Sequence, residues 1–362
     1  MKIKMVTFYL KRIYTSFAQH ILDVPPRLLA LLCFLLCLLF PITKPKSYAL
    51  FIMALANLMA IFSASWDLLV GRTGQMSLGH ALFFGIGAYS TALLYRFYKL
   101  PIVATIPIGI FITVLVAVLV GFPSMRVKGP YLALVSMAFP LIGTGLVFYF
   151  RQYTGGEEGV WGLPKLFPAL GRYDRRIAEY YFTLILLLIS AIIVYKIANS
   201  KTGVVFVSIL DDELASKACG INVTKYKLMA FAISALFAGL AGAVYAHMLG
   251  IANYETLSLS LSFLPVILTI LGGIGTIYGP IVGSYIYHIT DRFVLTEMNI
   301  PDVWHLLFFI VLVVIFILKW PRGIARVVTD KLKDLSEERE IEERGPHIWK
   351  KYKRKKEPAS EG

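Results

Sequence analysis

The chain has 362 residues, of which 57% are hydrophobic and only 16% charged, and its mean hydropathy is +0.70. This composition excludes a soluble globular domain, because too few polar residues remain to cover the surface of one. The formal net charge of +14 indicates membrane orientation rather than nucleic-acid binding, because basic residues gather in the cytoplasmic loops of membrane proteins.

Apolar runs of roughly 17 to 23 residues recur along the chain, each near the length of a membrane-spanning helix. They predict an all-α, polytopic membrane protein with about ten transmembrane helices in residues 27–320. The first run is not followed by a small-residue cleavage site, so we interpret it as an uncleaved helix rather than a signal peptide. The runs lie at 27–42, 49–70, 80–97, 101–121, 130–150, 180–198, 227–248, 259–275, 279–296 and 303–319.

The positions of the basic residues predict that both termini are cytoplasmic. In this orientation the N-terminal segment 1–26, the connection 199–225 and the charged tail 321–362 face the cytoplasm. The loop 151–179 faces outward, where it is either a contact for a partner or a solvated loop. Lys44 and Lys46, which would lie outside, count against this orientation. The run WKKYKRKK is either a contact for anionic lipid headgroups or part of a solvated tail.

The sequence predicts no catalytic, cofactor-binding or metal site. Cys33 and Cys37 lie four residues apart in an apolar run, where packing is a better explanation than metal binding. The motif GxxxxGK[ST] does not occur in the chain, so we expect no ATPase site in this chain.

The stretch GRTGQMSLGHALFFGIGAY, from Gly71 to Tyr89, places polar residues between two apolar runs. Polar side chains and non-helical backbone at membrane depth need protein partners or a water-filled cavity. We therefore interpret the stretch as a broken helix beside a transport pathway. The alternative is a tight cytoplasmic turn in which the histidine caps the next helix. The candidate pathway-lining residues are Gln75, Ser77, Gly79 and His80.

Small residues recur at four-residue spacing in two later runs, ALFAGLAGAVYA and LGGIGTIYGPIVGSY. This spacing is typical of close contacts between membrane helices. We assign helix packing to Gly239, Gly242, Gly279 and Gly283.

The connection 199–225 is too polar to cross a membrane, and its pattern predicts a short helix. Asp211, Asp212 and Glu213 are placed at the N-terminal end of this helix, where acidic side chains are favourable. Lys217 follows Glu213 by four residues, and Gly220 is placed to end the helix. The helix is either a simple connector or a surface that a cytoplasmic partner grips.

Five motifs in order along residues 50–320 resemble the branched-chain amino acid ABC transporter permeases, in the LivM branch. They are GQMSLGHALFFGIGAY, VKGPYLALVSMAF, TGGEEGVWGLP, DDELASKACGINVTKYKLMAFAISALFAGLAGAVYA and LGGIGTIYGPIVG.

This resemblance implies a permease subunit of an importer in a prokaryotic cell membrane. The importer would contain two permeases, two cytoplasmic ATPases and an extracytoplasmic solute-binding protein. The segment 211–220 matches the family's coupling loop, which implies that Asp212, Glu213, Ala215 and Gly220, with Asp211 beside them, couple to the ATPase. The family often carries arginines near the positions of Val204 and Leu210, which leaves the docking contacts open.

Three alternatives remain at the level of the sequence. Related permeases carry urea, short amides or a simple sugar, and the sequence barely separates these substrates. An ion-coupled secondary carrier needs ionisable groups deep in its spans, and the few candidates here, Asp291 and Arg292, lie toward a helix end. A membrane scaffold that transports nothing is the third alternative.

Overall fold

The computed structural model describes residues 34–319 except 126, 128, 277 and 296–300. The chain divides into two compact units, one made of Met1–Lys44 with Ala325–Gly362 and the other of Pro45–Ile324. Of the first unit, residues 34–44 are described; residues 34–43 are helical and end in the 3-10 helix η1 (Phe40–Thr43). The predicted segments 1–26 and 321–362, with the run WKKYKRKK, lie outside the described residues.

The described residues of the second unit form helices and one short strand pair, which confirms the predicted all-α class. Strand β1 (Val160–Trp161) pairs antiparallel with β2 (Ile251–Ala252), and Val160 faces Ala252 in the register. The helices are α3 (Ser47–Thr73), α4 (Ala81–Tyr98), α5 (Ile102–Ser124), α6 (Pro130–Tyr149), α7 (Arg151–Thr154), α8 (Arg172–Ala198), α9 (Lys201–Asp211), α10 (Glu213–Ala218), α11 (Val223–Leu249), the 3-10 helix η2 (Tyr254–Leu257), α12 (Leu259–Gly272), α13 (Gly279–Ile289), the π-helix η3 (Thr290–Leu295) and α14 (Asp302–Lys319).

Five helices of the described chain are long and apolar enough to cross a membrane. They are Ser47–Thr73, Ile102–Ser124, Tyr131–Tyr149, Arg172–Ala198 and Val223–Leu249.

Two elements of the structure differ from the predicted boundaries. Helix α8 begins at Arg172, inside the predicted loop 151–179, because its first turns are polar and hydropathy does not detect them. Arg176 pairs there with Glu179 at 2.7 Å (Nη1 to Oε2) and stabilises this polar start. The run 259–275 contains a helix of 14 residues, which ends at Gly272 because a glycine-rich turn follows.

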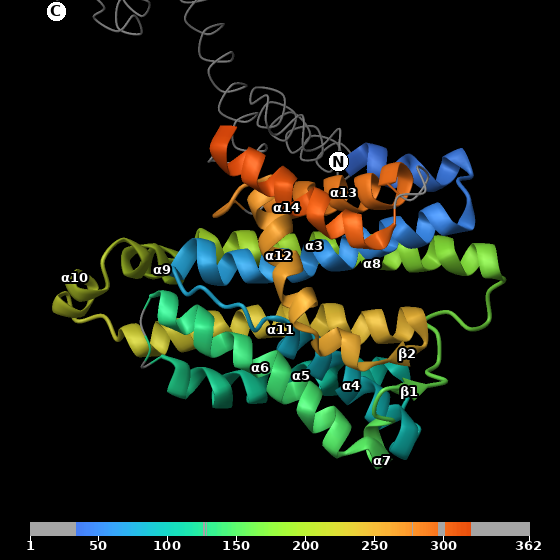
Figure 1. Cartoon of the computed structure of the whole chain (residues 1–362), viewed down its shortest axis with the longest axis horizontal. Coiled ribbons are helices and arrows are strands. Elements are labelled where there is room, and N and C mark those ends of the chain that lie inside the picture. Colours follow the sequence, from blue (N-terminus) through green and yellow to red (C-terminus); the bar gives the residue numbers. More distant parts are fainter. Residues whose placement is uncertain (1–33, 126, 128, 277, 296–300, 320–362) are drawn as a thin grey trace, which may run out of the picture. The chain divides into compact units, whose positions relative to one another are not determined.

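Helix α3 forms the core of the second unit and packs against α8, α11, α12 and α13. Most of its residues are apolar or small on all sides, and helices of this kind are buried. Figure 1 shows α8 and α11 running lengthwise beside α3, with α12 crossing α3.

Helix α11 packs most extensively against α4 and α5, and glycines allow the close approach. A Cβ atom added to Gly242 would overlap the carbonyl oxygen of Phe84, and one added to Gly87 would overlap that of Gly239. The α12–α13 pair is built in the same way, since a Cβ on Gly283 would overlap the carbonyl oxygen of Leu268. Main chains of neighbouring helices therefore touch directly at these positions.

The connections at the two ends of the long helices differ in character. Helices α9 and α10 lie at one end of α3 and α11, whereas α7, β1 and β2 lie at the opposite end (Figure 1). The charged connection 199–225 is thus separated from the loop after α6 by the length of the bundle.

We expect Gly242→Ala to weaken the contact between α4 and α11, because the new methyl group has no space beside Phe84. Overpacking of this kind costs about 1–3 kcal/mol. The measurement is the thermal midpoint of the detergent-purified chain. Gly145→Ala on α6 is the matched control, since no atom lies within 4 Å of its added Cβ. Equal midpoints for the two variants would contradict this packing.

Candidate functional site

Residues 74–80 connect α3 to α4 as a non-helical segment that turns back into the protein. Gly74 ends α3 in the left-handed conformation (φ 69°), and its N–H donates to the carbonyl of Val70. At the other end of the segment, His80 lies beside Ser65. Since Ser65 precedes the end of α3 at Thr73 by eight residues, the segment returns along α3 by about 12 Å.

The backbone of this segment is satisfied by side chains from three helices. The N–H of Leu78 donates to Oγ of Ser136 on α6 at 2.8 Å. The N–H of Ala81, at the start of α4, donates to Oγ of Ser262 on α12 at 3.1 Å. Nε1 of Trp66 on α3 donates to the carbonyl of Ser77 at 2.7 Å. Irregular backbone is tolerated at membrane depth because such partners replace the missing helical hydrogen bonds.

His80 connects the start of α4 to α3 and α11. Its Nε2 lies 2.9 Å from Oγ of Ser65 and 3.2 Å from Oγ of Ser234. Each serine gives its one hydroxyl hydrogen to a backbone carbonyl, Ser65 to Phe62 and Ser234 to Ser65, both at 2.6 Å. Nε2 of His80 is therefore the shared partner of both hydroxyls, and its role as donor or acceptor depends on the tautomer of the ring. Nδ1 of this buried ring has no hydrogen-bond partner in the described part of the chain.

The four residues singled out in the sequence come together in this segment and are enclosed by protein. Ser77 and His80 are fully buried, and Gln75 is 3% exposed. Nε2 of Gln75 donates to Oγ1 of Thr73 at 3.0 Å and to the carbonyl of Lys227 at 3.2 Å. Gly79 lies so close to α6 that a Cβ atom would overlap the carbonyl oxygen of Ser136.

Sequence reasoning overlooked the residues that hold this segment. These are Ser65, Ser136, Ser234 and Ser262, each a small hydroxyl residue inside an apolar run. Asp67 was also overlooked, although a single carboxylate in a long apolar run is a usable signal. Its Oδ1 accepts a hydrogen bond from the N–H of Gly275 at 2.7 Å and so holds the turn between α12 and α13 against α3.

The connection between α8 and α11 contains the expected short helix, α10. Asp212 caps it, because its Oδ1 accepts from the N–H groups of Leu214 at 2.8 Å and Ala215 at 3.0 Å. Gly220 follows the helix with φ +81°, a left-handed conformation that favours glycine. The prediction of a short helix ending at Gly220 is confirmed. The position predicted for Asp211 is wrong. Asp211 is the last residue of α9, a helix that was not predicted as separate from α10.

Glu213 joins α10 to α11. Its carboxylate contacts Nζ of Lys217 at 3.0 Å and Nζ of Lys227 at 2.6 Å. Burial raises the pKa of Glu213, but the hydrogen bonds and charges of Lys227 and Lys217 outweigh burial and lower the pKa below its ordinary value of 4.5. The carboxylate is therefore charged at neutral pH. Ser216 adds a link to α9, donating to the carbonyl of Ser208 at 2.9 Å.

These features define a polytopic membrane protein with a non-helical segment turned back into its interior and a capped, exposed helix at one end. The chain belongs to the family described as branched-chain amino acid transport system / permease component, whose model matches residues 48–317. It is accordingly a multi-pass protein of the cytoplasmic membrane.

Relatives of two kinds resemble the chain. It is 28% identical over 298 residues to the high-affinity branched-chain amino acid transport system permease protein LivM of Salmonella typhimurium, covering 75% of this chain and 69% of the relative. Identity to LivM of Escherichia coli is 27% over 307 residues, covering 78% and 71%. The autoinducer 2 import system permease protein LsrC of Salmonella paratyphi B is 27% identical over 265 residues, covering 71% and 70%. No solved structure matches the chain significantly.

Proposed function

We propose that this chain is the pathway-forming permease subunit of an ATP-binding-cassette importer for branched-chain amino acids. The observation that carries the proposal is the family match, which extends from α3 to α14 and so includes nearly all of the described helices. The two LivM relatives favour branched-chain amino acids as the substrate. A cavity for such substrates needs mostly apolar walls and a few polar groups for the charged ends of the amino acid.

The partners proposed are cytoplasmic ATPase subunits, a second homologous permease and an extracytoplasmic solute-binding protein. Because the sequence contains no phosphate-binding loop, ATP hydrolysis is assigned to the partners. The exposed helix α10 supports an ATPase contact, since its cap and its ion pairs hold it rigidly outside the bundle. The proposed coupling residues are Asp211, Asp212, Glu213, Ala215 and Gly220.

The orientation proposed has about ten crossings and both termini in the cytoplasm. It is supported by the positions of α9–α10 and of β1–β2 at opposite ends of the long helices (Figure 1). The α10 end is then cytoplasmic, and the loop after α6 is available to the solute-binding protein.

The segment 74–80 is proposed to line the pathway through Gln75, Ser77, Gly79 and His80. Its enclosure in this structure means that these side chains meet the solute only after helices move, as in an alternating-access cycle. A non-helical segment held by single serine hydroxyls is suited to such a change, because few hydrogen bonds between the segment and its neighbouring helices must be exchanged.

Thiol labelling tests both the orientation and the pathway. In a chain without Cys33 and Cys37, a membrane-impermeant reagent should reach the exposed Cys219 only from the cytoplasmic side. A Ser77→Cys variant that also lacks Cys219 should be labelled only while ATP is hydrolysed. Labelling of Cys219 from outside would refute the orientation, and permanent protection of position 77 would refute the pathway assignment.

Reconstitution with the partner subunits tests the substrate. We expect ATP-dependent uptake of leucine, isoleucine and valine into proteoliposomes, with mutual competition. Uptake of autoinducer 2, urea, an amide or a simple sugar in place of these amino acids would contradict the proposed substrate. Uptake driven by an ion gradient without ATP would overturn the class of transporter.

The same proteoliposomes test the coupling role of α10. Glu213→Lys should break both ion pairs of Glu213, and Gly220→Arg should disturb the left-handed turn after the helix. Both variants should insert into the membrane but lose the link between hydrolysis and uptake. Lys201→Glu, a charge reversal at the exposed start of α9, is the control and should transport normally. Normal uptake by both α10 variants would disprove the assignment.

A further inference from the structure

Lys227 on α11 contacts both the exposed helix α10 and the interrupted segment 74–80. Its Nζ lies 2.6 Å from Oε2 of Glu213 on α10, and the side chain is 13% exposed. Its backbone carbonyl accepts a hydrogen bond from Nε2 of Gln75 at 3.2 Å. One residue therefore joins two regions that are distant in sequence and that the proposed function assigns to coupling and to the pathway.

Helix α11 holds the other end of the segment as well. Oγ of Ser234 lies 3.2 Å from Nε2 of His80. Ser234 follows Lys227 by seven residues, about two helical turns, so both residues lie on the same face of α11. Gln75 and His80 are thus both attached to α11, so a shift or tilt of this helix acts on both ends of the segment.

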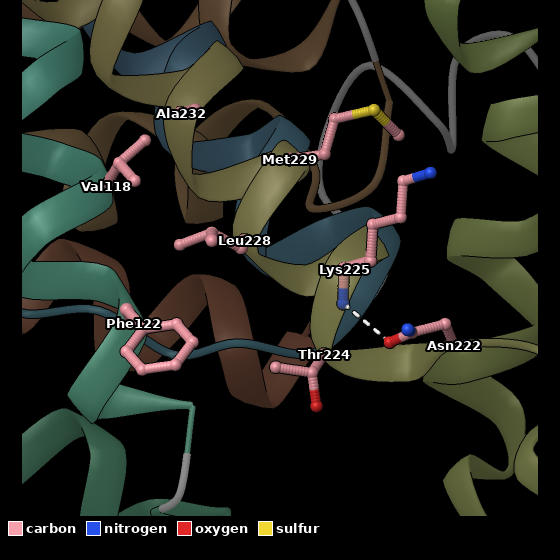
Figure 2. A pocket seen from close by; sticks show the side chains of 8 residues that line it. All are labelled: Val118, Phe122, Asn222, Thr224, Lys225, Leu228, Met229 and Ala232. Carbon is pink, nitrogen blue, oxygen red and sulfur yellow. Dashed lines mark hydrogen bonds between the residues drawn. The ribbon is translucent and has the colours of Figure 1, made fainter.

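The side of α11 that faces α5 is only partly covered at the first turns of the helix. A groove of about 720 Å³ lies between the end of α5 and the start of α11. Figure 2 shows Val118 and Phe122 on the α5 side, with Leu228 and Met229 on α11. Packed helices resist lateral movement because their side chains interdigitate. The end of α5 touches α11 beside the groove, since a Cβ atom added to Gly121 would lie 2.7 Å from Phe231 and 3.1 Å from Leu228. The groove leaves the rest of this contact unpacked.

We propose that Lys227 is the positioning residue that transmits movement of α10 to the segment 74–80 by shifting the start of α11. The inference rests on the proposed coupling role of α10 and adds the route through the subunit. Energetic coupling between distant sites needs a continuous set of contacts with two arrangements available to it. The contacts from Glu213 through Lys227 to Gln75 provide the route, and the groove provides room for the second arrangement.

The test compares the two lysines that pair with Glu213. Lys227→Met removes the contact with α10 and keeps a side chain of similar length. Lys217→Met is the matched control: Lys217 also pairs with Glu213, but its side chain is 45% exposed and it lies within α10. ATP hydrolysis and leucine uptake are measured in the same proteoliposomes, which contain the complete transporter.

We expect Lys227→Met to lower the number of leucine molecules taken up per ATP by about fivefold or more, the usual size of a coupling effect. Lys217→Met should leave this ratio close to that of the unaltered transporter. Lys227→Arg should do the same, because arginine keeps the positive charge at position 227. An unchanged ratio in Lys227→Met, or equal losses in the two Met variants, would overturn the proposal.

Two further variants separate transmission from a merely structural role. Gln75→Leu removes the hydrogen bond to Lys227 and leaves α10 intact, so it should lower the ratio while hydrolysis continues. A Ser77→Cys reporter should lose its ATP-dependent labelling when Lys227 is replaced, even though the ATPases still co-purify. If the Lys227→Met transporter does not assemble, the Gln75→Leu variant is the test of the route. A normal ratio of leucine uptake to ATP hydrolysis in Gln75→Leu would then overturn the route. Absence of ATP-driven uptake by the unaltered transporter would instead refute the proposed function.

Discussion

A non-helical stretch inside a membrane protein must find partners for its backbone groups without the help of water, and the segment between α3 and α4 shows how this chain meets that requirement. Ser136 and Ser262 accept its N–H groups, and Trp66 donates to one of its carbonyls. The partners come from helices far apart in sequence. The segment therefore fixes the positions of α3, α6 and α12 as much as these helices fix the segment.

Glycine contacts provide a second level of organisation around the same region. Gly242 lies against the carbonyl of Phe84, just after the start of α4, and Gly87 lies against Gly239 one turn further along α4. These contacts hold α11 to α4 beyond Ser234, whereas the groove leaves part of the beginning of α11 uncovered on the α5 side. The helix is thus held firmly in its second half and has room at its start.

Local patterns in the sequence were sufficient for most helices and for α10. The acidic residues before a short polar helix and the glycine after it act within a few residues, so they can be read from the sequence alone. Three of the four serines that hold residues 74–80 act across more than fifty positions, as Ser136 does with Leu78. Hydropathy likewise gives no sign that α8 starts with charged turns, or that His80 finds two hydroxyl partners. What could not be predicted was therefore set by tertiary contacts.

The strand pair at the other end of the bundle attaches the end of α11 to the loop that contains β1. Ile251 and Ala252 follow this helix almost directly and pair with Trp161 and Val160, and Nδ1 of His247 on α11 lies 3.0 Å from the carbonyl of Pro164. One helix is thereby tied to a loop on one membrane face and to α10 on the other. Consider one protein that binds this loop and another that binds α10, each of which shifts α11. Thermodynamic reciprocity then requires that each protein changes the binding affinity of the other by the same factor.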